Sequence, residues 1–238
     1  MKKFFIDFIC AFMPFLYFRF KFFKTCKNNH IEISPCDYQT VSLKIKGKNN
    51  TVIIKKRPEK AGKIKISMAA DESTVVIGEN VHVSSSLKIL MGQNHPNFGK
   101  VSNAKCIIGD GTSFESTEIV TFNSNSSIEI GEKCMFSTGI KIWNTDAHPI
   151  FDKETGRILN KVGALKIGSH VWCGAYVSIL KNTRIADDCI VGWGAVVSGK
   201  FDTPNGIIAG NPAKYVRHGI TWNADGSGRY IQNQPETE

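Results

Sequence analysis

Histidine is the side chain in this sequence best suited to move a proton near neutral pH, because its unperturbed pKa is about 6.5. One of the histidines, His148, stands in the stretch TDAHP, where Asp146 precedes it by two residues. A carboxylate near an imidazole fixes the tautomer of the ring and stabilises the imidazolium ion. The pair could therefore act as a general base with its orienting group, although Asp146 could equally bind a substrate or cap a turn.

Other residues near this pair could contact a substrate. Trp143 and Asn144 precede it, and an exposed indole can stack on a flat ligand face, although an aromatic at such an edge is as often a packing residue. His95, in the stretch NHPN, is the second candidate base and could instead contact a substrate. We expect His82 to face outward and His170 to be structural or exposed to solvent.

Composition indicates an ordinary globular chain with a surplus of positive charge. Of its 238 residues, 42% are hydrophobic and 21% charged, and the formal net charge is +9. Such a surplus suggests an anionic partner: a phosphate-bearing cofactor, an acidic glycan, a membrane surface or nucleic acid. The basic residues are scattered and no helix-turn-helix or RNA-binding signature is visible, so we expect no nucleic-acid partner.

The apolar residues recur with a period of six, which helices and simple strands do not produce. The clearest run is Ile167, Cys173, Ile179, Ile185, Val191 and Val197. This period predicts a coil with flat sides and sharp corners that buries its core by stacking. Two stretches break the phase, residues 90–106 and 148–164, and insertions in solenoids often carry the working face.

The seven cysteines form no CxxC pair. Cys134, Cys173 and Cys189 occupy repeat positions that elsewhere hold Val, Ile or Ala, so we expect small buried hydrophobic residues in a reducing compartment. No cluster with the spacing of a metal site is visible, and no metal is expected.

Four regions separate by composition. Residues 1–26 are aromatic and basic and are expected to be helical, either at a membrane interface or packed on the domain, with a cleaved signal less favoured. Residues 27–70 predict short strands, with a turn at Gly47–Asn50, that lead into the solenoid. Residues 71–201 carry the repeats, and residues 202–238 form a tail.

Three stretches resemble one known family. They are WNTDAHPIFDKETG (143–156), IGSHVWCGAYVSILKNTRI (167–185) and IIAGNPAKYVR (207–217). In order and spacing they are similar to the bacterial hexapeptide-repeat acyltransferases, in the branch of the sugar O-acetyltransferases, over roughly residues 70–220. The resemblance implies an all-β solenoid, a left-handed parallel β-helix with loop insertions; the period alone does not set its hand.

The resemblance implies transfer of acetyl from acetyl-CoA to a hydroxyl of a carbohydrate, such as a surface polysaccharide, lipid-linked glycan or sugar precursor. The family has its catalytic His in the motif that holds His148, which implies that His148 is the general base. No GxSxG elbow and no Ser–His–Asp order are visible, so a direct reaction in a ternary complex is favoured. From their positions, Trp143, Asn144 and His95 are candidates for acceptor binding. An antibiotic, an amino sugar or serine as acceptor remains an alternative. A β-helix scaffold without catalysis is a third reading, which His148 and the stretch AGNPAK disfavour.

The resemblance also assigns a cofactor side. Trp172 matches the Trp of a VWIG motif whose ring lies along the cofactor arm, and Gly174 and Ala175 match positions whose amides approach it. Trp193 replaces the small residue in the middle of the family's GAG motif, where its ring would narrow or cover the groove for the pantetheine arm. Trp193 and Gly194 are therefore assigned to the cofactor side, with a weaker match at Gly194. Basic residues are matched or suggested for the CoA phosphates: Lys200, Lys214 and Arg217.

A homotrimer with sites between adjacent chains is implied as well, closed by a threefold axis. We expect His148, Trp172 and Lys214 on one side of a rigid support. We expect a cytoplasmic protein that can also make peripheral contact with the inner face of the membrane.

Overall fold

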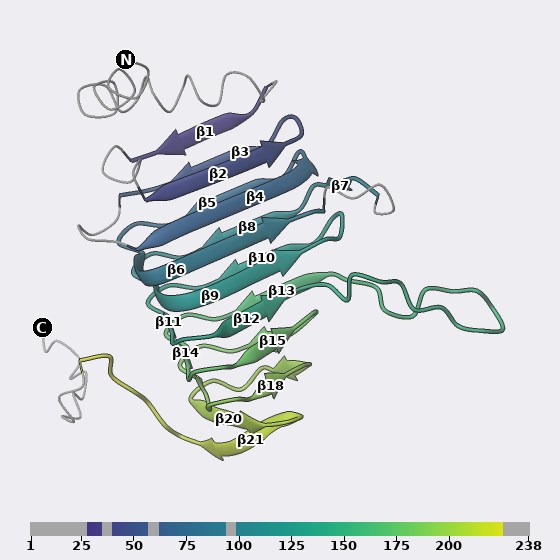
Figure 1. The fold of residues 1–238 in the computed structure, drawn as a ribbon. Coiled ribbons are helices and arrows are strands. Elements are labelled where there is room, and N and C mark those ends of the chain that lie inside the picture. The colour runs from purple at the N-terminus through teal and green to yellow at the C-terminus, as the bar shows by residue number, and fades with distance from the viewer. Residues whose placement is uncertain (1–27, 35–39, 57–61, 94–98, 226–238) are drawn as a thin grey trace, which may run out of the picture.

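The computed structural model describes residues 28–34, 40–56, 62–93 and 99–225. Within these residues the chain forms strands and no helix, and none of it could cross a membrane as a helix. Two parallel sheets wind into a tapering stack of coils (Figure 1). The aromatic segment 1–26 lies outside the described residues, as does His95.

An eight-stranded sheet makes the first side of the stack, named face 1 here. Its neighbours pair in parallel and in register, so side chains at equivalent positions form columns across the coils. In stacking order its strands are β1 (His30–Ile33), β3 (Thr51–Ile54), β5 (Thr74–Ile77), β8 (Lys105–Ile108), β10 (Ser127–Ile130), β13 (Ala164–Ile167), β16 (Arg184–Ile185) and β19 (Lys200–Phe201).

A thirteen-stranded sheet makes the other two sides, because β6 (His82–Met91) and β9 (Ser113–Thr121) continue around a corner. The start of β9 pairs with β11 and its end with β12. Face 2 consists of these strand starts with β11 (Met135–Phe136), β14 (Trp172–Cys173), β17 (Ile190–Val191), β20 (Gly206–Gly210) and the antiparallel β21 (Ala213–His218). Face 3 consists of β2 (Val41–Lys46), β4 (Lys63–Asp71), the ends of β6 and β9, β12 (Ile140–Trp143), β15 (Ser178–Leu180) and β18 (Val196–Val197), with β7 (Val101–Ser102) paired to the end of β4.

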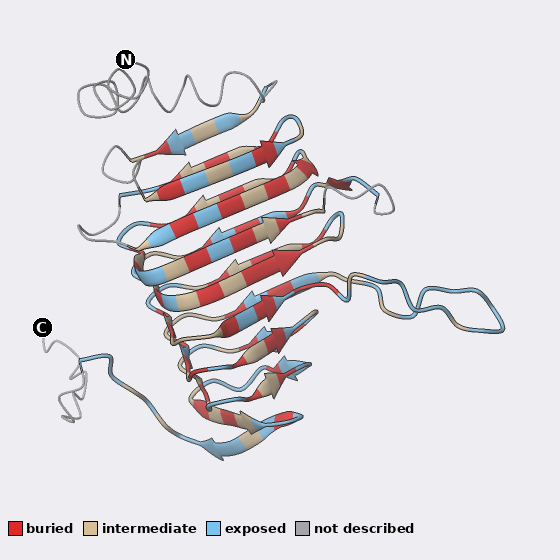
Figure 2. Ribbon diagram, viewed as in Figure 1, coloured by how far each residue is buried: buried red, intermediate tan, exposed pale blue. Residues whose placement is uncertain are grey.

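The six-residue period predicted this architecture because inward apolar side chains recur on each side of the coils. The early strands are longer than the period suggests, and β4 alone buries Ile64, Ile66, Met68 and Ala70. Phe114 and Phe136 stack inside with ring centroids 5.0 Å apart. Figure 2 shows the alternation of buried and exposed residues along the strands. Cys134, Cys173 and Cys189 are buried as predicted, and burial raises the pKa of Cys134 to about 11.

The regions drawn from composition do not coincide with the sheets. Strands β1 to β4, expected only to lead into the solenoid, pair in the same ladders as the later coils. At the other end β20 pairs with β17, so the sheet continues past residue 201 into the predicted tail. The expected turn at Gly47–Asn50 does separate β2 from β3.

Both predicted insertions leave from one corner, between face 3 and face 1. The first joins β6 to β7 and β8, and the second joins β12 to β13. The second is a long arm of residues 144–163, which Figure 1 shows projecting from the stack. A bridge between Phe151 and Ile158 ties its two sides together, and both side chains are exposed.

Candidate active site at the base of the arm

His148 lies where the arm leaves the coil, at a turn built by its neighbours. The Thr145 hydroxyl accepts a hydrogen bond from the Ala147 N–H at 3.0 Å, and the Asp146 carbonyl accepts one from the His148 N–H at 2.6 Å. Ala147 has φ of 61°, a left-handed conformation that is uncommon for a residue with a Cβ. The same conformation recurs at corner residues such as Asn125, Lys133 and Asn182, so here it marks the tight turn that precedes the exposed His148.

Asp146 is held by two side chains from other segments. Its carboxylate forms an ion pair with the ammonium group of Lys181, one coil further on, and accepts a hydrogen bond from Asn160 Nδ2 at 2.7 Å. Burial acts to raise the pKa of Asp146, but the bonds from Lys181 and Asn160 and the Lys181 charge outweigh it and hold that pKa below its usual value.

Asn160 joins the returning side of the arm to the outgoing side. Its Nδ2 donates to the His148 carbonyl at 2.9 Å, and its Oδ1 accepts from the Ile150 N–H at 2.8 Å. The backbone of His148 is therefore fixed from across the arm as well as from Asp146.

A hollow of about 440 Å³ lies beside His148. Its walls come from the corner loop of the preceding coil, residues 123–125, and from both sides of the arm, including Asp146, Ile158 and Asn160. The hollow is large enough for a ligand group beside His148, so this corner is the candidate active site.

Asn144 does not belong to the acceptor surface, contrary to the prediction. It is 0% exposed, and its Nδ2 donates to the carbonyls of Ser127 and Gly163, each at 2.9 Å. Its Oδ1 accepts from the Asn182 N–H at 3.1 Å. Asn144 therefore locks three successive coils together beneath the arm. Trp143 does remain available on face 3, at 39% exposure, with Lys141 Nζ 5.8 Å from its ring centroid.

Trp172 lies on face 2, in β14, and is 36% exposed. Gly174, just after it, donates its N–H to the Val191 carbonyl at 2.8 Å, so this amide is used within the stack rather than offered to a ligand. A Cβ at Gly174 would lie 3.0 Å from the Trp193 nitrogen, which explains the glycine by coil packing. Ala175 is buried, and its carbonyl accepts from the Gly194 N–H at 2.9 Å.

Trp193 stands at the corner between faces 2 and 3 and is 73% exposed. Its ring packs against Tyr176 of the preceding coil, with centroids 5.3 Å apart and planes tilted by 59°. Gly194 follows with φ of 67°, and a Cβ there would meet nothing within 4 Å. The departure from a small residue thus creates an aromatic pair on the surface, which the sequence did not reveal.

The arm and face 2 lie on different sides of one chain. His148 follows a strand of face 3, whereas Trp172 lies on face 2. Figure 1 shows the arm projecting on one side and the C-terminal segment lying on the other. The expectation that His148, Trp172 and Lys214 share one side of the support is therefore wrong, because a three-sided coil turns the chain between β12 and β14.

Similarity to known proteins decides the family. The sequence is 32% identical over 204 residues to a polysialic acid O-acetyltransferase of Neisseria meningitidis, covering 82% of this chain and 86% of the relative. The chain belongs to the polysialic acid O-acetyltransferase family. A polysialic acid O-acetyltransferase of Escherichia coli O1:K1 / APEC is 33% identical over 121 residues, covering 50% of this chain and 38% of that protein. No protein-family model matches.

Two solved structures agree with the fold. The polysialic acid O-acetyltransferase OatWY superposes with a TM-score of 0.55 and 27% identity, covering 89% of this chain and 93% of that one. The polySia-specific acetyltransferase NeuO gives a TM-score of 0.64 at 24% identity, covering 81% and 93%. The predicted left-handed parallel β-helix of a sugar O-acetyltransferase, an acyltransferase of the hexapeptide-repeat class, is confirmed.

In this O-acetyltransferase the three basic residues assigned to phosphates are exposed but not grouped. Lys214 and Arg217 lie on β21 at the end of the stack, whereas Lys200 lies on β19 of face 1. Lys214 and Arg217 lie on the same strand and can bind one anionic group together. Either of them is less well placed to do so with Lys200, which lies on another face.

Three residues of the site were missed by sequence reasoning: Lys181, Asn160 and Tyr176. Each acts through a neighbour in another coil or across the arm. Tyr176 covers Gly139 of the preceding coil, where a Cβ would lie 2.6 Å from the Tyr176 ring. Because the six-residue period aligns the coils, stacking the repeats could have predicted this contact. The length of the arm hid the link between Asp146 and Lys181.

Proposed function

We propose that this protein transfers acetyl from acetyl-CoA to a hydroxyl of an anionic glycan of the polysialic acid type, with His148 as general base. The observation that carries the proposal is the fixed turn at residues 145–148, which holds His148 beside a hollow of about 440 Å³. Membership of the family supports acetyl transfer as the reaction, and the geometry of this turn supports His148 as the general base.

The chemistry requires a base, because a protonated alcohol is a poor nucleophile. As the acceptor oxygen attacks the thioester carbonyl, the His148 imidazole takes the hydroxyl proton and can return it to the departing CoA thiolate. This balances the reaction without a metal ion or a covalent enzyme intermediate. A general base of this kind contributes about 10²- to 10⁴-fold to the rate.

Asp146 supports this role by anchoring the turn. Its carboxylate is committed to Lys181 and Asn160, and its carbonyl accepts from the His148 N–H. We propose that Asp146 and Lys181 are positioning residues that hold His148 at a fixed place relative to the stack. Small displacements of such groups reduce rates strongly.

The outer surface of face 3 supports an anionic acceptor. Lys65 of β4 pairs in register with Lys88 of β6, and Lys88 and Lys141 both bond Glu118 between them, at 2.7 and 3.3 Å. Three lysines against one glutamate leave this column, with strands about 4.8 Å apart, a net positive charge that extends to Trp143 at the base of the arm. A polymer with repeated carboxylates complements such a column.

We propose that the donor binds along face 2, with Trp172 beside the pantetheine arm and Lys214 and Arg217 near the phosphates. Because His148 and Trp172 are on different sides of one chain, a neighbouring copy must bring them together. A closed homotrimer meets this requirement, since a heterologous contact repeated three times leaves no unpaired surface.

The test supplies acetyl-CoA and one acceptor at a time to the purified full chain: polysialic acid oligomers, a neutral polysaccharide, chloramphenicol and serine. Thiol release and the mass of the product are measured. We expect an acetyl ester on the polysialic acid oligomers and little on the others. Transfer only to the drug or to serine would contradict the proposed acceptor, and no thiol release with any acceptor would contradict the proposed donor.

A further inference from the structure

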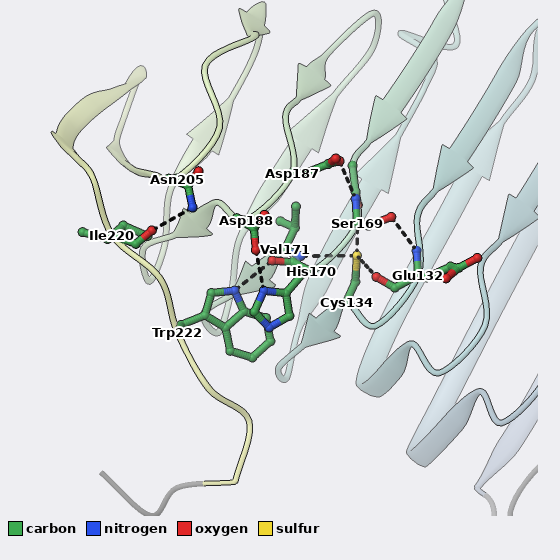
Figure 3. Close-up of polar contacts among 11 residues, drawn as sticks. Glu132, Cys134, Ser169, His170, Val171, Asp187, Asp188, Asn205, Ile220 and Trp222 are labelled. Atoms are coloured by element: carbon green, nitrogen blue, oxygen red, sulfur yellow. Dashed lines mark hydrogen bonds and ion pairs between the residues drawn. The ribbon is translucent and has the colours of Figure 1, made fainter. Parts of the chain in front are cut away.

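The chain beyond β21 returns along the stack as a strap, residues 219–225, within the stretch 202–238 that the sequence predicted as a C-terminal tail. Its start is pinned twice: the Ile220 N–H donates to the Asn205 carbonyl at 3.0 Å, and Asn205 Nδ2 donates to the Ile220 carbonyl at 3.1 Å. Figure 3 shows the second of these bonds, from Asn205 to Ile220, at the corner between face 1 and face 2. The strap is therefore a defined part of the fold rather than a loose end.

Trp222 in this strap is fixed on His170. Its indole N–H donates to the His170 carbonyl at 2.8 Å, and the two rings stack with centroids 4.2 Å apart and planes within 7°. His170 is held in turn, because its Nδ1 lies 2.8 Å from Asp188 Oδ1 (Figure 3). A stacked ring with an additional hydrogen bond has little freedom to rotate, so the indole has a defined place.

That place is beside Trp172. The two indoles lie with centroids 5.9 Å apart and planes tilted by 42°. Trp172 is set by its strand, whose residues pair with β11 and β17, and about a third of it stays exposed. The pair forms an angled aromatic wall in which one ring comes from the stack and the other from the strap.

We infer that Trp222 is a positioning residue of the donor site: it packs on Trp172 and sets the orientation in which that ring meets acetyl-CoA. This inference rests on the proposed function, in which Trp172 lines the pantetheine arm. An angled pair of indoles suits a thin, partly apolar chain, because it contacts the chain from two directions and excludes water. The strap then makes the C-terminal segment part of donor recognition.

The alternative is that Trp222 only closes the corner and contributes stability. The two cases differ in what the variant changes: packing alone alters melting temperature, whereas a donor-site role alters acetyl-CoA binding while leaving acceptor binding unchanged. The Trp222→Phe variant keeps an aromatic ring against His170 and Trp172 but loses the N–H bond, so it serves as the conservative partner of Trp222→Ala.

The experiment measures the dissociation constant of acetyl-CoA by calorimetry, with both KM values and kcat, for the full chain and both variants. Thermal melting and size-exclusion chromatography confirm the folded assembly. We expect Trp222→Ala to raise the dissociation constant and KM of acetyl-CoA by about 3- to 10-fold. The acceptor KM should stay within about twofold, and Trp222→Phe should recover most of the affinity.

Unchanged or tighter acetyl-CoA binding by a folded Trp222→Ala variant would overturn the inference and leave the proposed function standing. Equal changes in the donor and acceptor KM values would also overturn it, because they indicate a general disturbance. If the unaltered protein binds no acetyl-CoA, both the inference and the proposed function fail. Ile107→Ala on β8 of face 1, at 37% exposure, is the control for the loss of a partly exposed apolar side chain away from the strap, and we expect it to leave acetyl-CoA binding unchanged.

Discussion

Lys181 reaches back 35 residues in the sequence to bind the carboxylate of Asp146, two residues before His148. The contact joins the corner of one coil to the corner of the next, so the stack itself holds the turn from which the arm leaves. The position of His148 depends on the spacing of coils rather than on the loop alone.

Replacing Lys181 should therefore lower activity without removing the base. We expect Lys181→Met to reduce kcat by roughly tenfold or more, because Asp146 loses its ion pair and the turn is less well held. Lys166→Met is the matched control, since Lys166 pairs with Glu129 at 3.0 Å on face 1. Steady-state rates that fall equally in both variants would argue against a specific role for Lys181.

The acid sensitivity of this anchor follows from the lowered pKa of Asp146. Because the folded pKa lies below the unfolded value, the carboxylate contributes stability above the ordinary aspartate pKa, and this contribution is lost as pH falls through the lowered value. The melting temperature of the unaltered protein should exceed that of Asp146→Asn at neutral pH, and the gap should close toward pH values below about 4. A gap that widens on acidification would have the wrong sign.

Asn144 should matter for stability more than for acceptor binding. We expect Asn144→Ala to reduce the free energy of unfolding by about 1–3 kcal/mol or more, because it leaves buried partners in three coils unsatisfied. Urea denaturation measures the change. An unaltered midpoint together with a raised acceptor KM would return Asn144 to the acceptor surface.

The close packing of successive coils also depends on stacked glycines. A Cβ at Gly131 would lie 2.6 Å from the carbonyl carbon and oxygen of Gly168, both backbone atoms. Gly131→Ala must move one coil against the next and should cost about 1–3 kcal/mol in the free energy of unfolding. Gly99→Ala is the matched control, because a Cβ there would meet nothing within 4 Å and Gly99, like Gly131, does not have a left-handed backbone. A smaller loss for Gly131→Ala than for Gly99→Ala would contradict the packing argument.

Sharing of the site between chains can be tested by mixing two inactive variants. If His148 of one chain works with Trp172 of its neighbour, assemblies formed from unfolded mixtures of His148→Ala and Trp172→Ala chains contain some intact sites. We expect the mixture to regain about a quarter of the unaltered activity. No regain after mixed refolding, with homogeneous controls refolding normally, would indicate that both residues act within one chain.

The sequence was sufficient to predict the coiled fold and to locate the residues where the repeat is interrupted. The period of six identified the inward positions, including Cys134, and the two breaks in phase located the arm that begins near His148. These features depend on neighbours within one repeat, which a sequence displays directly.

The relations between coils were harder to predict. In the sequence, Asn144 is a polar residue close to the proposed general base His148. In the structure it is buried, because three coils meet beneath the arm. Trp222 carries no repeat signal, since the strap that presents it runs back along the stack rather than continuing it. The separation of His148 from Trp172 also follows from the three-sided turn of the coil and not from their spacing in the chain.

The most direct test of the central claim is the initial rate of acetyl transfer from acetyl-CoA to polysialic acid oligomers by His148→Ala, at saturating concentrations of both substrates. With a folded assembly and unchanged acetyl-CoA affinity, we expect kcat to fall by about 10²- to 10⁴-fold. A kcat within about twofold of the unaltered protein would contradict the assignment of His148 as the general base.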